Sequence, residues 1–227
     1  MNDAKAEWAW LGMVPYQTAM SLQERIRDDI LAGFARNILL LLEHPPVITL
    51  GRNAQEGHVL LPLSRLTELG IELWRTSRGG DVTFHGPGQL VGYPIFHLRQ
   101  GVRSHLEAMA RAIVEWLGRL GISSEWRAPT PGVWVGREKI CAFGIHVRHR
   151  VAIHGFALNL SPDMDGFRAI VPCGLRDAGV TSVARLLGSA PSAEVAARDL
   201  IGSFEKHFGV QLIESACSGV LTNRADR

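Results

Sequence analysis

The sequence predicts a single α+β domain whose helices pack on a mixed or antiparallel sheet. Short apolar runs and alternating runs indicate strands, and stretches with apolar residues three or four positions apart indicate helices. No internal repeat, low-complexity tract or linker interrupts the 227 residues. Because a chain of this length can enclose one sizeable core, we expect one domain over residues 1–227, with an unstructured polar tail from about residue 215.

The first half of the chain alternates between helical and extended patterns. An amphipathic helix opens at Pro15, and its apolar stripe consists of Ala19, Met20, Ile26 and Ile30. A buried strand fits the apolar run NILLLLEH, which Pro45-Pro46 closes, and a second strand fits VITLGRN. We expect a short helix over residues 59–70. A strand or hairpin fits IELWRTSRGGDVTFHGPG, because apolar and polar side chains alternate there up to the turn Gly86-Pro87-Gly88.

The second half combines two long helices with a run of strands. A helix over residues 104–120 follows from one apolar stripe, made of Leu106, Met109, Ile113, Trp116, Leu117 and Leu120. Between Glu125 and Ser161 we expect a meander of the strands SEWRA, GVWVG, KICAFGIHVRH and VAIHGFALNLS. The last helix extends from Ser192 to Phe208, and Gly209 ends it.

Composition excludes several classes of protein. With 46% apolar and 20% charged residues, the chain is typical of globular proteins, and a net charge of +2 is too weak to indicate nucleic-acid binding. The three cysteines form no C-x-x-C motif, so neither a disulfide framework nor a zinc site is expected. Reduced thiols favour the cytoplasm. No secretory signal pattern and no apolar run of membrane-spanning length is present in the sequence.

A glycine-rich stretch begins at Arg78 and reads RGGDVTFHGPGQLVGYPIFHL, with four glycines in its first eleven residues. It matches neither the dinucleotide fingerprint G-x-G-x-x-G nor the P-loop motif. Close backbone approach to a ligand, or turns with positive φ, explain the glycines better. A glycine-rich hairpin that binds nothing would show the same pattern.

Cys173, in IVPCGLRDAG, is a candidate nucleophile. Pro172 fixes the backbone before it and Gly174 leaves space after it, although free cysteines more commonly pack as small apolar residues. A reactive cysteine needs a nearby cation that favours the thiolate. Lys139 is a candidate for that cation, although most lysines at hairpin ends lie in water. Cys141 should share the strand face of Lys139, and we interpret it as a packing residue.

Histidines offer a second set of candidates. His85 and His154 each stand beside a glycine at the end of an apolar strand, where either could be the base of a Cys-His pair or a structural hydrogen-bonding group. His146 and His149 lack the H-E-x-x-H pattern of metalloproteases, so no metal is expected. The basic turn at residues 148–150 fits a solvated hairpin tip or a docking site for an acidic partner.

Several segments taken together resemble the lipoyl(octanoyl) transferases, also called lipoate-protein ligase B. The resemblance rests on HPPVITLGR, RGGDVTFHGPGQLVGYPI, GVWVGREKICAFGIHV, HGFALNL, and IVPCGL followed by GVTS, in the order and spacing of that family. It implies a catalytic domain with a motif-bearing core over about residues 43–182. It also implies a fold like that of the biotin and lipoate protein ligases, with a curved, mostly antiparallel sheet packed by helices.

The resemblance further implies an activity. An octanoyl or lipoyl group would pass from acyl carrier protein, through a cysteine thioester, to a specific lysine of lipoyl domains in 2-oxoacid dehydrogenases and glycine cleavage H protein. This is the first step of endogenous lipoate cofactor assembly. No ATP, cofactor or metal is implied, no nucleic acid or membrane is a partner, and we expect a cytoplasmic monomer.

The resemblance assigns roles to individual residues. Cys173 matches the acyl-thioester cysteine, and Lys139 matches the lysine that lowers the pKa of that cysteine. The residues that match the acyl-binding site are Arg78, Gly79, Gly80, Asp81, Val82, Thr83, Phe84, His85, Ala142, Phe143, Gly144, Gly155, Phe156 and Ala157. Three positions depart from the family pattern, because Asp81 and Phe84 stand where glutamine and tyrosine are common, and Cys141 stands where a small residue is expected.

Three alternatives stay open. An ATP-dependent lipoate or biotin ligase on the same fold would modify its acceptor from ATP and the free acid. A Cys-His thioester hydrolase would release free octanoate. An acyl-binding module without activity would bind the acyl group and gain no covalent mass.

Overall fold

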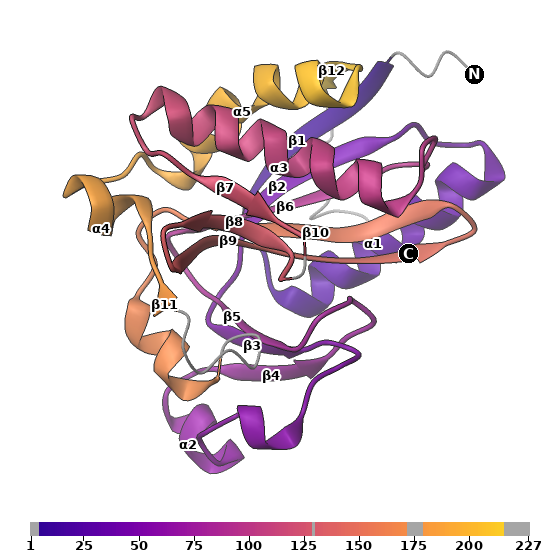
Figure 1. Cartoon of the computed structure of the whole chain (residues 1–227). Helices are drawn as coiled ribbons and strands as arrows, with labels where there is room; N and C mark the ends of the chain where they lie inside the picture. Colours follow the sequence, from indigo (N-terminus) through magenta and orange to yellow (C-terminus); the bar gives the residue numbers. More distant parts are fainter. Residues whose placement is uncertain (1–4, 129, 172–178, 216–227) are drawn as a thin grey trace.

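A computed structural model of the chain describes residues 5–128, 130–171 and 179–215 (Figure 1). Its helices are α1 (Tyr16–Ala32), α2 (Leu63–Glu68), α3 (Val102–Arg119), α4 (Val183–Leu187) and α5 (Ala193–Phe208), with short 3-10 turns η1 (Glu56–His58) and η2 (Met164–Ala169). Its strands are β1 (Lys5–Met13), β2 (Ile38–Glu43), β3 (Val47–Leu50), β4 (Glu72–Arg75), β5 (Val82–His85), β6 (Gln89–Ile95), β7 (Glu125–Arg127), β8 (Gly132–Val135), β9 (Glu138–Arg148), β10 (Val151–Asn159), β11 (Gly179–Val180) and β12 (Gln211–Glu214).

The main sheet has the strand order β12-β1-β2-β6-β10-β9-β8-β7, and β11 pairs with β9. Pairing is antiparallel from β2 through β7, whereas β1 is parallel to both β2 and β12, and β11 is parallel to β9. Helices α3 and α5 cover one face, and α1 covers the other (Figure 1). The predicted α+β class with a mixed, mostly antiparallel sheet is therefore confirmed.

The predicted meander is also confirmed. Strands β7, β8, β9 and β10 pair in sequence order, each antiparallel to the next. The turn between β9 and β10 contains His149 and Arg150 with φ of 47° and 68°. Two consecutive left-handed residues are the geometry of a type I′ hairpin turn, whose twist matches that of the flanking strands. The basic turn is a hairpin tip, as one of the two interpretations had it.

A second, smaller sheet was not expected. Strand β3 lies at its centre, with β4 parallel on one side and β5 antiparallel on the other (Figure 1). The prediction of one strand or hairpin over residues 71–88 is wrong, because β4 and β5 each pair with β3 and not with each other. The buried strand β3 lies between β4 and β5 and forms backbone hydrogen bonds along both of its edges. The glycine-rich segment between β4 and β5 makes no tight turn, because it crosses to the main sheet.

The other differences concern the ends of elements. Helix α2 begins after Pro62 and ends at Glu68, so it is shorter than the predicted 59–70. Strands β1 and β12 form one edge of the main sheet and had no counterpart in the sequence prediction. The predicted tail lies almost wholly outside the described residues. Within the described ranges no helix is both long and apolar enough to cross a membrane.

Candidate active site

Glycines let the backbone of the segment 78–80 approach the main sheet. The Gly79 amide donates a hydrogen bond of 2.9 Å to the Ile145 carbonyl. A Cβ atom on Gly144 would lie 2.9 Å from the Gly79 oxygen, and one on Gly155 would lie 2.2 Å from the Gly92 oxygen. Side chains at these positions would push the segment away from β9 or split β10 from β6. The glycine density therefore serves close backbone packing around a cavity.

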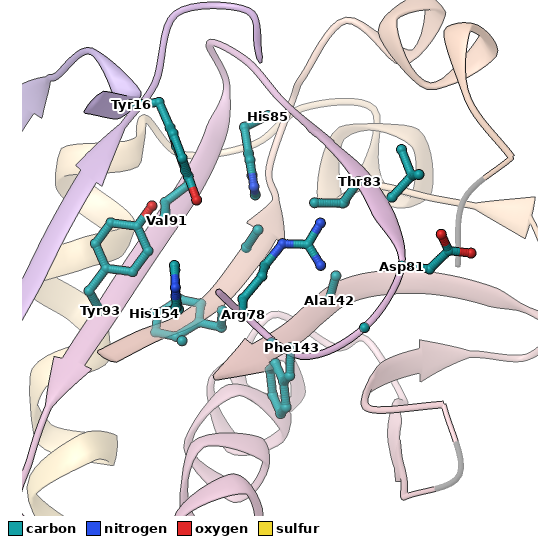
Figure 2. Close-up of a pocket in the computed structure, with 16 residues that line it drawn as sticks. Tyr16, Arg78, Asp81, Thr83, His85, Val91, Tyr93, Ala142, Phe143 and His154 are labelled. Atoms are coloured by element: carbon teal, nitrogen blue, oxygen red, sulfur yellow. The ribbon is translucent and has the colours of Figure 1, made fainter. Parts of the chain in front are cut away.

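The cavity lies between the glycine-rich segment with β5 on one side and strands β6, β9 and β10 on the other (Figure 2). Its lining is Tyr16, Arg78, Gly80, Asp81, Val82, Thr83, His85, Val91, Tyr93, Ala142, Phe143, Gly144, His154, Gly155, Phe156 and Ala157. All the residues predicted for acyl binding line it, except Gly79 and Phe84. The structure thus brings the glycine-rich segment against the hairpin of β9 and β10, which lies far from it in the sequence.

Gly79 and Phe84 lie beside the cavity. Gly79 contributes its backbone to β9, as described above. Phe84 is buried in the small sheet's own core and meets Phe167 edge to face, with ring centroids 5.4 Å apart. Alternation along β5 explains this, because Thr83 and His85 point into the cavity while Phe84 points to the opposite side.

Two charged residues of the segment are held by specific partners. The buried Arg78 guanidinium donates to the Thr49 carbonyl at 2.6 Å, to the Thr49 hydroxyl at 2.9 and 3.1 Å, and to the Gly79 carbonyl at 3.1 Å. Asp81 accepts from His58 Nδ1 at 2.5 Å and from the Gln55 amide at 3.3 Å. These bonds fix the segment against β3 and η1, so the cavity wall is pre-organised.

One polar part of the cavity was not predicted from the sequence: Tyr16 and Tyr93 line the cavity, and His44 contacts both of them. His44 Nδ1 lies 2.6 Å from the Val14 carbonyl, and His44 Nε2 lies 2.7 Å from the Tyr93 hydroxyl. Because a carbonyl only accepts, Nδ1 carries the proton and Nε2 accepts from Tyr93. Burial lowers the pKa of His44 to about 4 and raises the pKa of both tyrosines, so all three groups are neutral near pH 7.

His85 and His154 both line the cavity. Burial first, and then nearby charged groups, lower the pKa of each to about 3. His154 has a left-handed φ of 60°, and its amide donates to the Gln23 side chain at 2.7 Å. Such a conformation is uncommon outside glycine, and it is held in place by that buried hydrogen bond. Neither imidazole is an effective proton acceptor near neutral pH, which argues against a Cys-His pair built on them.

Lys139 is buried, with 7% of its surface exposed, and its ammonium lies 4.9 Å from the centre of the Trp134 ring. The interpretation of a solvated hairpin-end lysine is therefore wrong. A small cavity is lined by Thr83, Gln89, Lys139, Ala142, Ala157, Asn159, Phe167 and Val180. It shares Thr83, Ala142 and Ala157 with the larger cavity. The two cavities are therefore neighbours: Lys139 lines the small one, and the histidines and tyrosines line the larger one.

Cys173 lies outside the described residues, so its role stays a prediction. The description ends at Val171 and resumes at Gly179. Val171 donates to the His58 carbonyl at 2.8 Å, and Val180 pairs with Lys139 in the sheet. The described chain thus stops beside η1 at Val171 and resumes alongside the strand of Lys139.

Cys141 is fully buried in the core between the main sheet and helices α3 and α5, and burial raises the pKa of its thiol well above the usual range. Its interpretation as a packing residue is confirmed. The expectation that it shares a face with Lys139 is wrong. Trp134 pairs with Lys139 while its neighbour Val133 pairs with Cys141, so a β-bulge at Ile140 reverses the alternation.

The comparisons with known proteins agree with this geometry. Residues 15–206 match the family model described as the lipoyl protein ligase A/B catalytic domain. The octanoyltransferase of Alkaliphilus metalliredigens is 40% identical over 90% of this chain and 96% of its own length. The octanoyltransferase of Solibacter usitatus is 46% identical, over 87% and 89%. That of Myxococcus xanthus is 45% identical over 82% of this chain, which spans 55% of that longer relative.

Solved structures show the fold. A lipoate-protein ligase A bound with ATP superposes with a TM-score of 0.75 at 20% identity, over 96% of this chain and 92% of that one. A biotin protein ligase from Aquifex aeolicus gives 0.54 at 11% identity, over 90% and 69%. The resemblance that the motifs indicated is confirmed, and the chain belongs to the octanoyltransferases of the lipoyl protein ligase A/B family and is an acyltransferase.

Proposed function

We propose that this enzyme moves an octanoyl group from octanoyl acyl carrier protein, through a thioester on Cys173, to one lysine of a lipoyl domain. The observation that carries the proposal is the position of Lys139. Its side chain is buried and lines the small cavity beside the predicted acyl cavity, and its strand pairs with β11, which directly follows the segment containing Cys173. A buried cation is what a cysteine needs in order to react as its thiolate.

The chemistry balances with these two residues alone. The Cys173 thiolate attacks the thioester carbonyl, and the carbon–sulfur bond to the carrier breaks. Lys139 gives its proton to the departing sulfur and becomes a neutral amine. When the neutral acceptor lysine attacks the acyl-Cys173 carbonyl, Lys139 takes the proton that the new amide nitrogen loses. Cys173 then leaves as a thiolate, which restores the starting ion pair.

The lining of the cavity suits the acyl chain. Apolar surface from Val91, Ala142 and Ala157 lies beside imidazole groups that are neutral near pH 7. The charged side chains in the lining are those of Arg78 and Asp81, and each of them is held by hydrogen bonds to its own partners. A thioester of a medium-length fatty acid carries no charge and gains by leaving water. The pathway needs no cofactor, and we propose that the enzyme acts in the cytoplasm as a monomer.

The acceptor is proposed from relatives. A bipartite lipoate protein ligase of Thermoplasma acidophilum, which belongs to a lipoylation system together with its E2 lipoyl domain, is similar to this chain with a TM-score of 0.74 and 20% identity. We propose lipoyl domains of 2-oxoacid dehydrogenases and glycine cleavage H protein as acceptors here.

Intact-protein mass spectrometry after incubation with octanoyl acyl carrier protein tests the proposal. We expect one octanoyl adduct, which disappears in Cys173→Ser, persists in Cys141→Ser and moves to an added lipoyl domain. Lys139→Ala should slow formation of the adduct by about 100-fold, as loss of a proton-transfer group does. Modification of the lipoyl domain without any adduct on the enzyme would contradict the thioester step. Modification from ATP and free octanoate would indicate a ligase instead, and release of free octanoate would indicate a hydrolase.

A further inference from the structure

A second cleft lies beyond the end of β6, between the first turn of α3 and the last turn of α5. Its volume is about 440 Å³, which is enough for a small-molecule ligand. Among the described residues, none that lines this cleft also lines the acyl cavity or the small cavity beside Lys139. The cleft is therefore separate from the candidate active site, and the proposed acyl transfer does not use it.

The first turn of α3 borders the cleft. Gly101 is the N-cap residue of this helix, with a positive φ of 89°, and no side chain in the described part of the chain caps it. Gly101 and Ser104 both line the cleft. The first backbone amides of a helix have no partner within the helix, and together with the helix dipole they favour an anion. The start of this 18-residue helix is thus a place where an anionic group can bind.

A buried imidazole lies beside this helix start. His105 is 6% exposed, and its Nε2 has no hydrogen-bond partner among the residues that the structure describes. Its ring meets the rings of Phe96 and Phe208 edge to face, with centroids 6.2 and 5.3 Å apart, and all three residues line the cleft. Helical side chains lean toward the N-terminus of their helix, so this imidazole lies below the first turn of α3. A buried polar atom without a partner is costly, and a ligand atom that accepts from Nε2–H would remove that cost.

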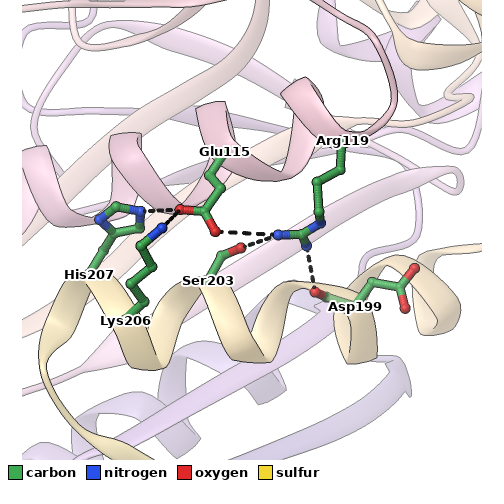
Figure 3. A network of polar contacts seen from close by, with 6 residues as sticks. All are labelled: Glu115, Arg119, Asp199, Ser203, Lys206 and His207. Atoms are coloured by element: carbon green, nitrogen blue, oxygen red, sulfur yellow. Dashed lines mark hydrogen bonds and ion pairs between the residues drawn. The ribbon is translucent and has the colours of Figure 1, made fainter.

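The charged side chains of the cleft are all basic. His97, Arg99 and Lys206 line it, and no aspartate or glutamate of the described ranges does so. Lys206 and His207 stand in the last turn of α5, where they offset the partial negative charge at the carbonyl end of that helix. Both also contact Glu115, which lies outside the lining (Figure 3). The side chains around the cleft therefore favour an anion, as the start of α3 does.

We propose that this cleft is a second ligand site, which binds a small organic phosphate. The phosphate group accepts hydrogen bonds from the first amides of α3, from His105 Nε2–H and from Lys206. The rest of the molecule covers Phe96, Leu98 and Phe208, which supply the apolar part of the lining. A phosphate has enough oxygens to accept from these three kinds of donor at once, and helix N-termini are common phosphate sites.

Titration of the full chain with phenyl phosphate, followed through NMR shifts of backbone amides and imidazoles, tests the proposal. We expect saturable binding at one site, with the largest shifts in residues 101–105. Inorganic phosphate should bind about 10-fold more weakly, because it has no ring to bury against the apolar lining. Phenol should cause no shifts at the start of α3, because it carries no phosphate.

Two substitutions in the cleft each remove one donor. His105→Phe keeps a ring of similar size, and it should weaken phenyl phosphate binding by about 10-fold through the loss of a hydrogen bond to a charged group. Lys206→Gln changes a surface position that tolerates substitution, and it should weaken binding and reduce its dependence on salt. Arg111→Gln is the matched control, because it removes an exposed cation from the same helix outside the cleft, and it should leave the affinity unchanged. All three variants should transfer octanoyl groups at the normal rate, since none of these residues lines the acyl cavity.

Several results would overturn the proposal. These are no saturable binding at millimolar phenyl phosphate, shifts centred on the acyl cavity, or an affinity that neither His105→Phe nor Lys206→Gln changes. Equal affinities for inorganic phosphate and phenyl phosphate would overturn the apolar half of the site. Sedimentation with vesicles of phosphatidylcholine and phosphatidic acid distinguishes a lipid headgroup from a free phosphate ester, and pelleting that His105→Phe abolishes would overturn the free ligand. Each result is independent of the thioester on Cys173, which the octanoyl adduct tests separately.

Discussion

The tautomer and the protonation state of His85 follow from the groups around it. Two backbone carbonyls accept from the NH2 groups of Asn159 and Gln89, so Gln89 turns its oxygen toward His85 and the ring carries its proton on Nδ1. Burial lowers its pKa to about 3. We predict that 15N NMR of labelled protein will show one neutral Nδ1–H tautomer from pH 8 to pH 5. In Gln89→Leu the ring should populate both tautomers. A titration midpoint near 6.5 for His85 in the unmodified chain would contradict this prediction.

The glycines that border the cavity give a second prediction at the scale of residues. Gly144→Ala places a Cβ 2.9 Å from the Gly79 oxygen and 3.2 Å from Arg78 Cδ, both parts of a buried segment. We expect a loss of about 1–3 kcal/mol in the free energy of unfolding, with weaker octanoyl binding, measured by urea denaturation and by KM.

Gly118 supplies the matched control for that substitution. It lies on the exposed side of α3, and a Cβ there would meet nothing within 4 Å. Gly118→Ala should therefore stabilise the protein by about 0.5–1 kcal/mol through helix propensity. If both substitutions changed the free energy of unfolding equally, the segment at 78–80 would be able to move away from a Cβ atom on Gly144 at little cost. That result would contradict the close packing of this segment against β9.

At the scale of elements, a polar network joins α3 to α5 (Figure 3). Glu115 accepts from Lys206 at 2.8 Å and from His207 at 2.7 Å, and these two contacts lower its pKa. Arg119 donates to Ser203 at 2.7 Å and to the Asp199 carbonyl at 2.9 Å. The network fixes the register of two helices whose apolar sides form the larger core.

We predict that Glu115→Gln costs about 1 kcal/mol or less in the free energy of unfolding, because the carboxylate is 30% exposed and water screens its ion pairs. The cost should shrink further in 1 M salt. Urea denaturation at two ionic strengths measures both effects. A cost that does not depend on salt would show that lost hydrogen bonding, and not charge, explains the change.

The sequence was a good guide wherever pairing is local. The strands β7 to β10 follow one another through short turns, and the amphipathic stripes of α1, α3 and α5 are periodic within a single element. It failed where partners are distant. Strand β3 pairs with β4 on one edge and with β5 on the other, and β12 pairs with β1 from the opposite end of the chain. A local irregularity was missed as well, because the bulge at Ile140 places Cys141 on the opposite face from the one that strict alternation assigns.

The candidate site divides in the same way. The residues of the glycine-rich segment and of β9 and β10 were found, because each group is contiguous and resembles a known motif. Tyr16, His44 and Tyr93 were missed, because they come from α1, the end of β2 and β6 and meet only when those elements pack. The proline pair after His44 was the available signal, and it indicated only the end of a strand.

At the scale of the whole molecule, the cavity lies along the seam between the two sheets. The main sheet supplies a floor through β6, β9 and β10, and the small sheet supplies a wall through β5 and the segment at 78–80. Polar side chains that line the boundary between the two sheets are therefore buried when the sheets pack together. Four histidines become buried in the fold, three around the cavity and His105 between Phe96 and Phe208.

These histidines predict the acid sensitivity of the enzyme. Burial lowers the pKa to about 4 for His44 and His105 and to about 3 for His85 and His154, against 6.5 for an unperturbed histidine. Between those values the unfolded chain binds more protons than the native one. The free energy of unfolding is therefore greatest above pH 6.5 and falls as the pH drops toward 4, by up to about 1.4 kcal/mol per pH unit for each histidine.

Urea midpoints measured from pH 7.5 to 5.5 should show this slope, at a pH above the range in which carboxylates titrate. His105→Phe tests it away from the cavity. His105 Nε2 is buried without a hydrogen-bond partner in the described part of the chain, so the substitution should raise stability by about 1 kcal/mol at pH 7.5 and by more at pH 5. His97→Phe replaces an exposed histidine and should leave the slope unchanged. If His105→Phe gives the same gain at both pH values, His105 is protonated in the native state, and the acid sensitivity must come from other groups.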